Sequence, residues 1–274
     1  ACACSLIIWS NTCSALARLC TRSETRGRMA IKHQDVLKLL AAAKLVQAVD
    51  SDVKRCAHWA RLGPHAATRE PAQIGTEVIE TLMLRWNCIL HAAPAEVAPL
   101  YVHTTALALA LCLHRQGFAD VRLTHDAITA VAALNAAVAL NDTFHRRSAE
   151  IEALLRSAPL MPTRRPSVPK ANTAWRAGDV VGMQAAGRHH AFHVLEVSHD
   201  APIVEFYDIA QDMPLAWEQL QGVRARGERL NDGRDYVDRH ALYGLQQQPD
   251  PARQFRLLAS GIAHGPDNAH LARH

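Results

Sequence analysis

Aromatic residues are scarce in this chain of 274 residues, at 5% of the total, and long uninterrupted apolar stretches are missing. The strongest apolar run, Thr104–Leu113, has about half of the roughly 20 residues that a membrane-spanning helix needs. A second apolar segment, Ile74–Ala93, is interrupted by Glu77, Glu80 and Arg85. We therefore expect both segments to form core helices, and we expect no membrane partner.

Cysteine is absent after Cys112, and four of the seven cysteines lie within the first 20 residues. The other three, Cys56, Cys88 and Cys112, each lie in a helical pattern, where a lone cysteine is typically a small buried apolar residue. We expect neither a disulfide framework nor a cysteine metal site. The default location is then a reducing cytoplasm.

The first 28 residues differ in composition from the rest, because they contain four arginines and one acidic residue. Met29 opens a regular helical pattern, so we interpret residues 1–28 as an upstream extension that is non-native or disordered. The arginines follow the apolar segment Ser5–Trp9, whereas a secretory signal carries its positive charges before the apolar run. A transit peptide is the alternative that this Arg-rich composition fits.

Recognised catalytic and cofactor motifs are also missing. The sequence has no G-x-S-x-G, no phosphate-binding loop, no G-x-G-x-x-G and no H-E-x-x-H pattern. Ser198-His199-Asp200 is contiguous, whereas the members of a catalytic triad are brought together in space, so these three residues are weak evidence for a hydrolase. We expect no catalytic residues and no cofactor.

A run of histidines, His189, His190, His193 and His199, raises the possibility of a zinc site. On a regular strand His189 and His193 share one face but lie about 13 Å apart, at about 3.3 Å per residue. Ligands of one zinc ion each lie about 2 Å from it. Because His190 points to the opposite face, we expect no metal site on this strand.

Charge is unevenly distributed along the chain. Residues 29–160 contain 13 basic and 12 acidic residues, and residues 175–274 contain 10 basic and 13 acidic residues. The basic excess lies in residues 1–28 and 161–174. A general nucleic-acid-binding protein presents a basic face, so we expect no nucleic-acid partner.

Residues 29–160 repeat apolar residues at helical spacing and predict an all-helical domain of about six helices. Gly117 is a typical C-terminal stop for the apolar helix before it. Thr124 and Thr143 are the residue type that caps helix N-termini. The expected helices are residues 35–49, a short helix from Asp50, a helix after Pro71, Tyr101–Gln116, Asp126–Leu140 and Phe144–Ser157.

Residues 161–174 predict a linker, since three prolines and three positive charges lie within 161–170. The pattern then changes to strand-like alternation, which predicts a small β-rich domain over 175–262 and a flexible tail over 263–274. Three strands, Val180–Gln184, His189–Val197 and Ile203–Asp208, are expected to form an antiparallel meander, and Arg253–Ser260 a last strand. The predicted class is α+β: an N-terminal all-helical bundle followed by a small, curved, mainly antiparallel β domain.

Four short motifs in the β segment carry a resemblance to a known family. They are G-D-V-V at Gly178–Val181, a polar turn ending in Gly187-Arg188, H-A-F-H-V-L at His190–Leu195, and V-E-F-Y-D at Val204–Asp208. This order resembles the immunity protein 26 type of domain, although His189-His190 stand where an aromatic residue is more typical. The resemblance implies a bacterial cytoplasmic protein that binds and neutralises a cognate toxin of a polymorphic toxin system.

An immunity protein needs a complementary surface and no catalytic residues. If the toxin is a basic nuclease, an acidic face would speed association, and aromatic side chains would anchor the contact. We expect the interface to include Glu205, Tyr207, Asp208, Asp212, Trp217, Asp232, Asp235, Tyr236 and Asp238.

Two alternatives remain open on the sequence. In the first, the protein is a non-catalytic regulatory or adaptor protein whose β domain binds a peptide or a small ligand. In the second, it is a hydrolase that uses the histidine-rich strand, with Glu205, Asp208 and Asp212 as possible paired carboxylates. Histidine and carboxylate side chains that converge in one pocket would favour the hydrolase.

Overall fold

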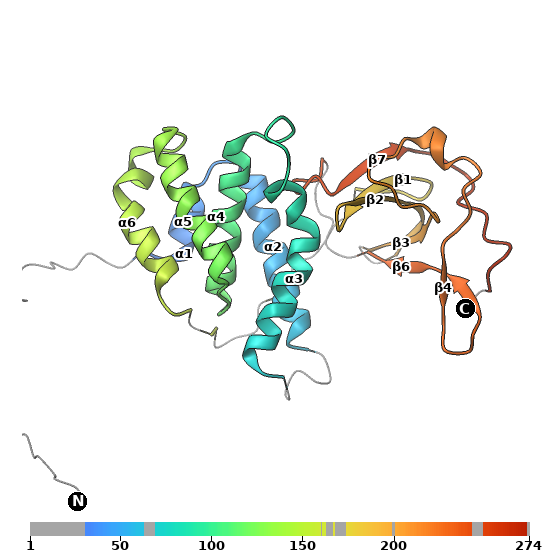
Figure 1. The fold of residues 1–274 in the computed structure, drawn as a ribbon, viewed down its shortest axis with the longest axis horizontal. Coiled ribbons are helices and arrows are strands. Elements are labelled where there is room, and N and C mark those ends of the chain that lie inside the picture. Colours follow the sequence, from blue (N-terminus) through green and yellow to red (C-terminus); the bar gives the residue numbers. More distant parts are fainter. Residues whose placement is uncertain are drawn as a thin grey trace, which may run out of the picture. The chain divides into compact units, whose positions relative to one another are not determined.

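The computed structural model describes residues 31–62, 69–159, 161–162, 167, 174–198, 201–242 and 249–272. Residues 1–28 and most of the predicted linker lie outside this described part. Six helices are followed along the chain by a mainly antiparallel sheet, so the predicted α+β class is confirmed (Figure 1). Over the described residues, every helix is too short or too polar to cross a membrane.

The helical half is built around α4, the most apolar helix. Its residues Thr104–His114 are all buried, because the segment is apolar on every face and is surrounded by its neighbours. Trp86 and Phe144 are the largest fully buried side chains of this core. The helices are α1 (His33–Leu39), α2 (Ala43–Ala60), α3 (Pro71–Leu90), α4 (Pro99–Arg115), α5 (Val121–Ala136) and α6 (Asp142–Arg156).

The predicted helix over 35–49 is instead divided into two helices. The extended backbone of Leu40 ends α1, and Ala42, with a left-handed backbone (φ 59°), is the N-cap residue of α2. The predicted helix start at Asp50 is wrong, because residues 50–52 lie inside α2. The caps also differ from expectation: the side chains of Asp120 and Asn141 accept the first-turn N–H groups of α5 and α6.

The main sheet has five strands in the order β6-β3-β2-β1-β7, and each neighbouring pair is antiparallel. A second sheet consists of the β4–β5 hairpin. The two-residue turn after β1 has positive φ at both positions, which suits the twist of a tight hairpin. The strands are β1 (Val180–Ala185), β2 (Arg188–Ser198), β3 (Ala201–Phe206), β4 (Gly227–Arg229), β5 (Asp235–Val237), β6 (Arg239–Ala241) and β7 (Phe255–Ala259), with a short 3-10 helix at Trp217–Leu220.

Strand β2 is central, as its apolar residues on both faces predict. Phe192 and Val194 pack on one side with Trp175 and Phe206. Ala191 packs on the other side, in a cluster that includes Val180, Tyr207, Leu215 and Leu220. Burial on both faces of β2 therefore accounts for its central position in the sheet.

Two residues near the end of the described part of the chain pair with the β half. Asp267 forms a bridge with Arg224, and Ala272 forms a bridge with Tyr236 of β5. The segment before β7 reaches the helical core, where Ala252 is fully buried. Residues 31–274 thus form one unit, and the predicted domain boundaries stay predictions.

Candidate functional site at the junction of the two sheets

Among the described residues, a group of three potential metal-ligating side chains lies where β5 gives way to β6. Asp238 is held between two neighbouring segments: its N–H donates to the carbonyl of Arg226 at 3.0 Å, and its carbonyl accepts from the N–H of Phe206 at 3.4 Å. His240 follows two residues later, on β6. Residues two apart on a strand share a face, so the side chains of Asp238 and His240 lie together.

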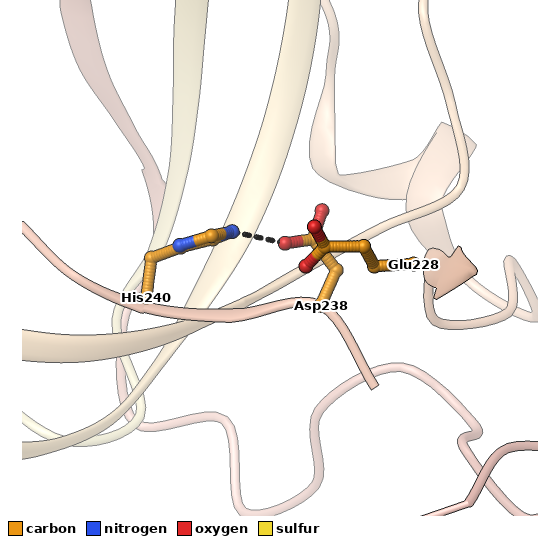
Figure 2. Close-up of side chains that lie close together, drawn as sticks. All are labelled: Glu228, Asp238 and His240. Atoms are coloured by element: carbon orange, nitrogen blue, oxygen red, sulfur yellow. Dashed lines mark ion pairs between the residues drawn. The ribbon is translucent and has the colours of Figure 1, made fainter. Parts of the chain in front are cut away.

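Glu228 of β4 completes this group, which we name the junction cluster: Glu228, Asp238 and His240. One ligand atom from each residue lies within 4.8 Å of the others. Figure 2 shows the His240 ring directed at the Asp238 carboxylate, with which it forms an ion pair. Asp238 is buried, whereas Glu228 and His240 are exposed.

Two neighbours fix the orientation of the junction cluster. Arg226 Nε donates to Oδ2 of Asp238, which leaves Oδ1 on the side of His240. Within the described part of the chain, Oδ1 accepts no hydrogen bond of normal geometry. The His240 ring packs edge-on against Phe206 at 6.1 Å between centroids. An imidazole and two carboxylates supply the nitrogen and oxygen donors that divalent transition metals accept.

Three of the nine predicted partner-binding residues are buried inside the β half. Glu205 is 1% exposed and accepts from Arg239 at 3.0 Å and from Asn268 at 2.8 Å. Asp238 pairs with Arg226 and His240. Burial raises the pKa of Tyr207 to about 12. We correct the expectation here, because Glu205, Tyr207 and Asp238 are not available on an accessible face.

The other six predicted residues reach the surface in two separate places. Asp208, Asp212 and Trp217 follow β3, and Asp212 lies 3.9 Å from Arg188. Asp232, Asp235 and Tyr236 belong to the β4–β5 hairpin. Arg229 and Arg234 stand in the same hairpin. The surface is therefore of mixed charge, and the uniformly acidic face that we expect from the sequence is not found there.

The histidine-rich strand does not gather its side chains. His193 is buried, and its Nε2 lies 3.1 Å from the carbonyl oxygen of Ile262. His190 points to the other face of β2, and burial lowers the pKa of both His189 and His190. His199 and Asp200 lie outside the described residues. Among the histidines that are described on β2, none converges with another on a shared position.

Sequence reasoning missed two members of the junction cluster, Glu228 and His240. The signal for His240 is the D-x-H pattern at residues 238–240, which places both side chains on one face if the segment is extended. Glu228 lies on another strand and joins them through the chain reversal of the hairpin. The sequence signal for that reversal is Asp232-Gly233 at the turn, which does not identify the strands on either side of it.

A second polar group, centred on Arg85 of α3, is structural. Arg85 Nε donates to Asp52 at 2.8 Å, and its Nη2 donates to Asp250 at 2.5 Å. Asp250 also accepts the backbone N–H groups of Gln254 and Phe255, at 3.0 and 3.1 Å. Because both carboxylates already accept several donors, this group ties α2 and α3 to the start of β7 and leaves little capacity for a ligand.

Comparisons with known proteins yield no relative of this chain: no family model, no curated protein and no solved structure matches it. The resemblance to the immunity protein 26 type of domain therefore has no family match behind it. The function has to be argued from the surface and from the side chains that the fold brings together.

Proposed function

We propose that this chain is an immunity-type protein that binds and neutralises a cognate bacterial toxin by direct protein contact. The observation that carries the proposal is the β4–β5 hairpin, a separate two-stranded sheet beside the five-stranded one. It bears Asp232, Asp235 and Tyr236, which we name the hairpin surface. Tyrosine is one of the residue types that are enriched at protein–protein hot spots.

The hairpin surface is ordered by its own hydrogen bonds. Asp232 accepts the backbone N–H of Arg234 at 3.0 Å and the hydroxyl of Tyr236 at 2.7 Å. The second bond also raises the pKa of Tyr236. Ala272 supports the hairpin from the side, because its N–H donates to the carbonyl of Asp235 at 2.9 Å. Such order lowers the entropy that is lost on binding.

The mixed charge of the hairpin bears on the class of partner. Alternating Arg229, Asp232, Arg234 and Asp235 favour recognition of a patterned protein surface, since unlike charges placed in register exclude wrong partners. A basic nuclease remains one toxin class that the two aspartates would fit. The proposed location is the bacterial cytoplasm, with which free Cys56, Cys88 and Cys112 are compatible.

The hydrolase alternative named the histidine-rich strand β2. A histidine and two carboxylates do converge in the junction cluster, but they come from β4 and the β5–β6 segment, and the cluster includes no histidine of β2. Covalent catalysis also needs a nucleophile within hydrogen-bond reach of a base, and the histidines described on β2 do not meet that condition. The adaptor alternative would use the same hairpin surface to bind a different kind of partner. The immunity and adaptor functions are distinguished by whether the partner is toxic when it is produced alone.

Neutralisation is tested by co-expression in a bacterial host. The polypeptide encoded next to this chain in its genome is induced alone, with the wild-type chain, and with the double variant Asp232→Lys, Asp235→Lys. We expect growth arrest by the neighbour alone, rescue by the wild type, and loss of rescue with the double variant.

The matched control carries the same two charge reversals on the helices. Glu80→Lys with Asp126→Lys also changes two exposed acidic residues, and this control should rescue growth as the wild type does. Equal rescue by both double variants would exclude the hairpin surface. A neighbour that does not arrest growth, or arrest that the wild type does not relieve, would count against the immunity function itself.

A further inference from the structure

We propose that the junction cluster of Glu228, Asp238 and His240 binds one divalent transition-metal ion of the zinc class. The ion would join the β4–β5 hairpin to strand β6 of the main sheet. This inference is independent of toxin binding, because it rests on the three side chains and not on the hairpin surface.

The spacing along the chain permits a shared ion. Asp238 and His240 are two residues apart on extended backbone, so their side chains point the same way from positions roughly 7 Å apart. His189 and His193 are four residues apart, which is too far. Glu228 approaches from β4, and one ligand atom from each of the three residues lies within 4.8 Å of the others. Ligands at about 2.0–2.2 Å from a common ion would need only small side-chain rotations.

Asp238 is the buried member of the junction cluster, with a side chain that is 7% exposed. Its Oδ2 accepts from Arg226, and its Oδ1 is in ion-pair contact with His240. The buried carboxylate is therefore held in place with Oδ1 directed at the other two members of the cluster. A metal ion held by all three side chains would replace the direct contact between Oδ1 and His240.

The surroundings resemble the support that metal ligands usually receive. Arg226 donates to Oδ2 of Asp238 and holds the carboxylate plane, and Phe206 packs against the His240 ring. Outer hydrogen bonds of this kind orient the ligands and tune their affinity. Arg226 offsets one of the two carboxylate charges, so the cluster keeps a net charge that still attracts a cation.

The donor set also selects the class of ion. One imidazole nitrogen and two carboxylates suit zinc, cobalt or manganese better than a soft ion that prefers thiolate. The described cysteines, Cys56, Cys88 and Cys112, all lie in helices and offer no thiolate to this site. Glu228 and His240 are exposed, so the remaining coordination positions are open to water.

The test measures metal binding to the full chain without an affinity tag, at neutral pH. Isothermal titration with Zn²⁺ is compared between the wild type, Glu228→Gln and His240→Gln, and Co²⁺ is added in parallel for its visible absorption. Both variants change exposed side chains, so the fold should be kept, which circular dichroism checks. The matched controls, Glu218→Gln and His270→Gln, alter exposed residues of the same types outside the cluster.

We expect one equivalent of Zn²⁺ that is lost or weakened at least about 10-fold in Glu228→Gln and in His240→Gln, and retained in both controls. The Co²⁺ absorption should follow the same pattern. Binding of equal stoichiometry and affinity in the wild type and both cluster variants would overturn the proposal. So would a wild type that binds no Zn²⁺, or a loss of the same size in the controls, which would indicate scattered binding to surface histidines.

Discussion

His33 and His114 form a partly buried link among the helices. Nε2 of His114 lies 2.9 Å from the carbonyl oxygen of Ser157, which only accepts, so His114 donates there. Nδ1 of His114 lies 2.8 Å from Nε2 of His33. The two rings thereby connect α1, α4 and the end of α6.

This link predicts a dependence of stability on pH. Burial, with the nearby His114 and Arg115, lowers the pKa of His33 from 6.5 to about 4. The unfolded chain therefore binds more protons in that window, so the free energy of unfolding should fall as the pH drops from about 6.5 towards 4. The loss will be modest, since His33 is half-buried and solvent screens it.

The measurement is urea unfolding at several pH values. The variant His33→Gln should show a smaller decrease over the same interval, while the variant of an exposed histidine, His145→Gln, should follow the wild type. Parallel pH profiles for wild type and His33→Gln would show that His33 is not the group that titrates.

The buried Arg85 network predicts a large loss of stability on mutation. Arg85→Met removes the cation that Asp52 and Asp250 share. Buried Asp250 then loses its arginine partner, and Asp52 keeps only Arg55, at 3.2 Å. Breaking such a pair typically costs about 3–5 kcal/mol. Chemical denaturation should therefore show a much lower unfolding midpoint for this variant.

A surface ion pair provides the control for that measurement. Arg156 pairs with Glu152 one turn away on α6, at 3.0 Å, and is largely exposed. Arg156→Met should change stability by no more than about 0.5 kcal/mol. If both arginine variants lose the same small amount, the Arg85 network does not hold α2 and α3 to the segment before β7.

Among the elements, helix existence could be predicted from periodicity, whereas helix starts could not. The sequence predicts Thr124 and Thr143 as the N-cap residues. In the structure, Asp120 caps α5, about one turn before Thr124, and Asn141 caps α6, two residues before Thr143. Several polar residues precede each helix. Which of them adopts the extended N-cap conformation depends on the path of the preceding loop. The end of α4 is easier to predict than the helix starts. Gly117 follows this helix with a positive φ of 85°, a conformation that favours glycine.

This difference can be tested on α5. Asp120 accepts the N–H of Leu123 at 2.8 Å, so Asp120→Ala should reduce the free energy of unfolding by about 1 kcal/mol. Thr124 lies inside α5 in the structure, so Thr124→Ala should be nearly neutral. Urea midpoints of the two variants decide between the caps, and the reverse order would restore the sequence-based assignment.

The strands differ in the same way, because some can be predicted from local sequence and others depend on contacts between distant segments. The long strands β1, β2 and β3 could be predicted from alternation, and β7 from its apolar composition. Strands β4, β5 and β6 have three residues each, too few for a clear alternation. β4 and β5 pair with each other in a hairpin, whereas β6 pairs with β3, which lies much earlier in the chain. The burial of Glu205 is of this kind, because its partners Arg239 and Asn268 follow 34 and 63 residues later.

At the scale of the whole molecule, the helical bundle and the sheet are parts of one unit. Arg85 reaches Asp250, and Arg253 donates to the carbonyl of Glu96 at the turn between α3 and α4. The β half carries the proposed recognition surface, and the bundle supports the segment that leads into its edge strand β7. The candidate surface could be predicted in part. The acidic and aromatic residue types of the hairpin can be identified in the sequence, whereas their arrangement depends on these long-range contacts.

The central claim is that the hairpin surface binds a toxin. The most direct test is the dissociation constant, by isothermal titration, between the purified chain and the catalytically inactivated polypeptide encoded beside it. A hot-spot residue contributes at least about 2 kcal/mol, so Tyr236→Ala should weaken binding by at least about 30-fold, while Tyr101→Ala on α4 should leave it unchanged. A Tyr236→Ala variant that binds as tightly as the wild type would contradict the account.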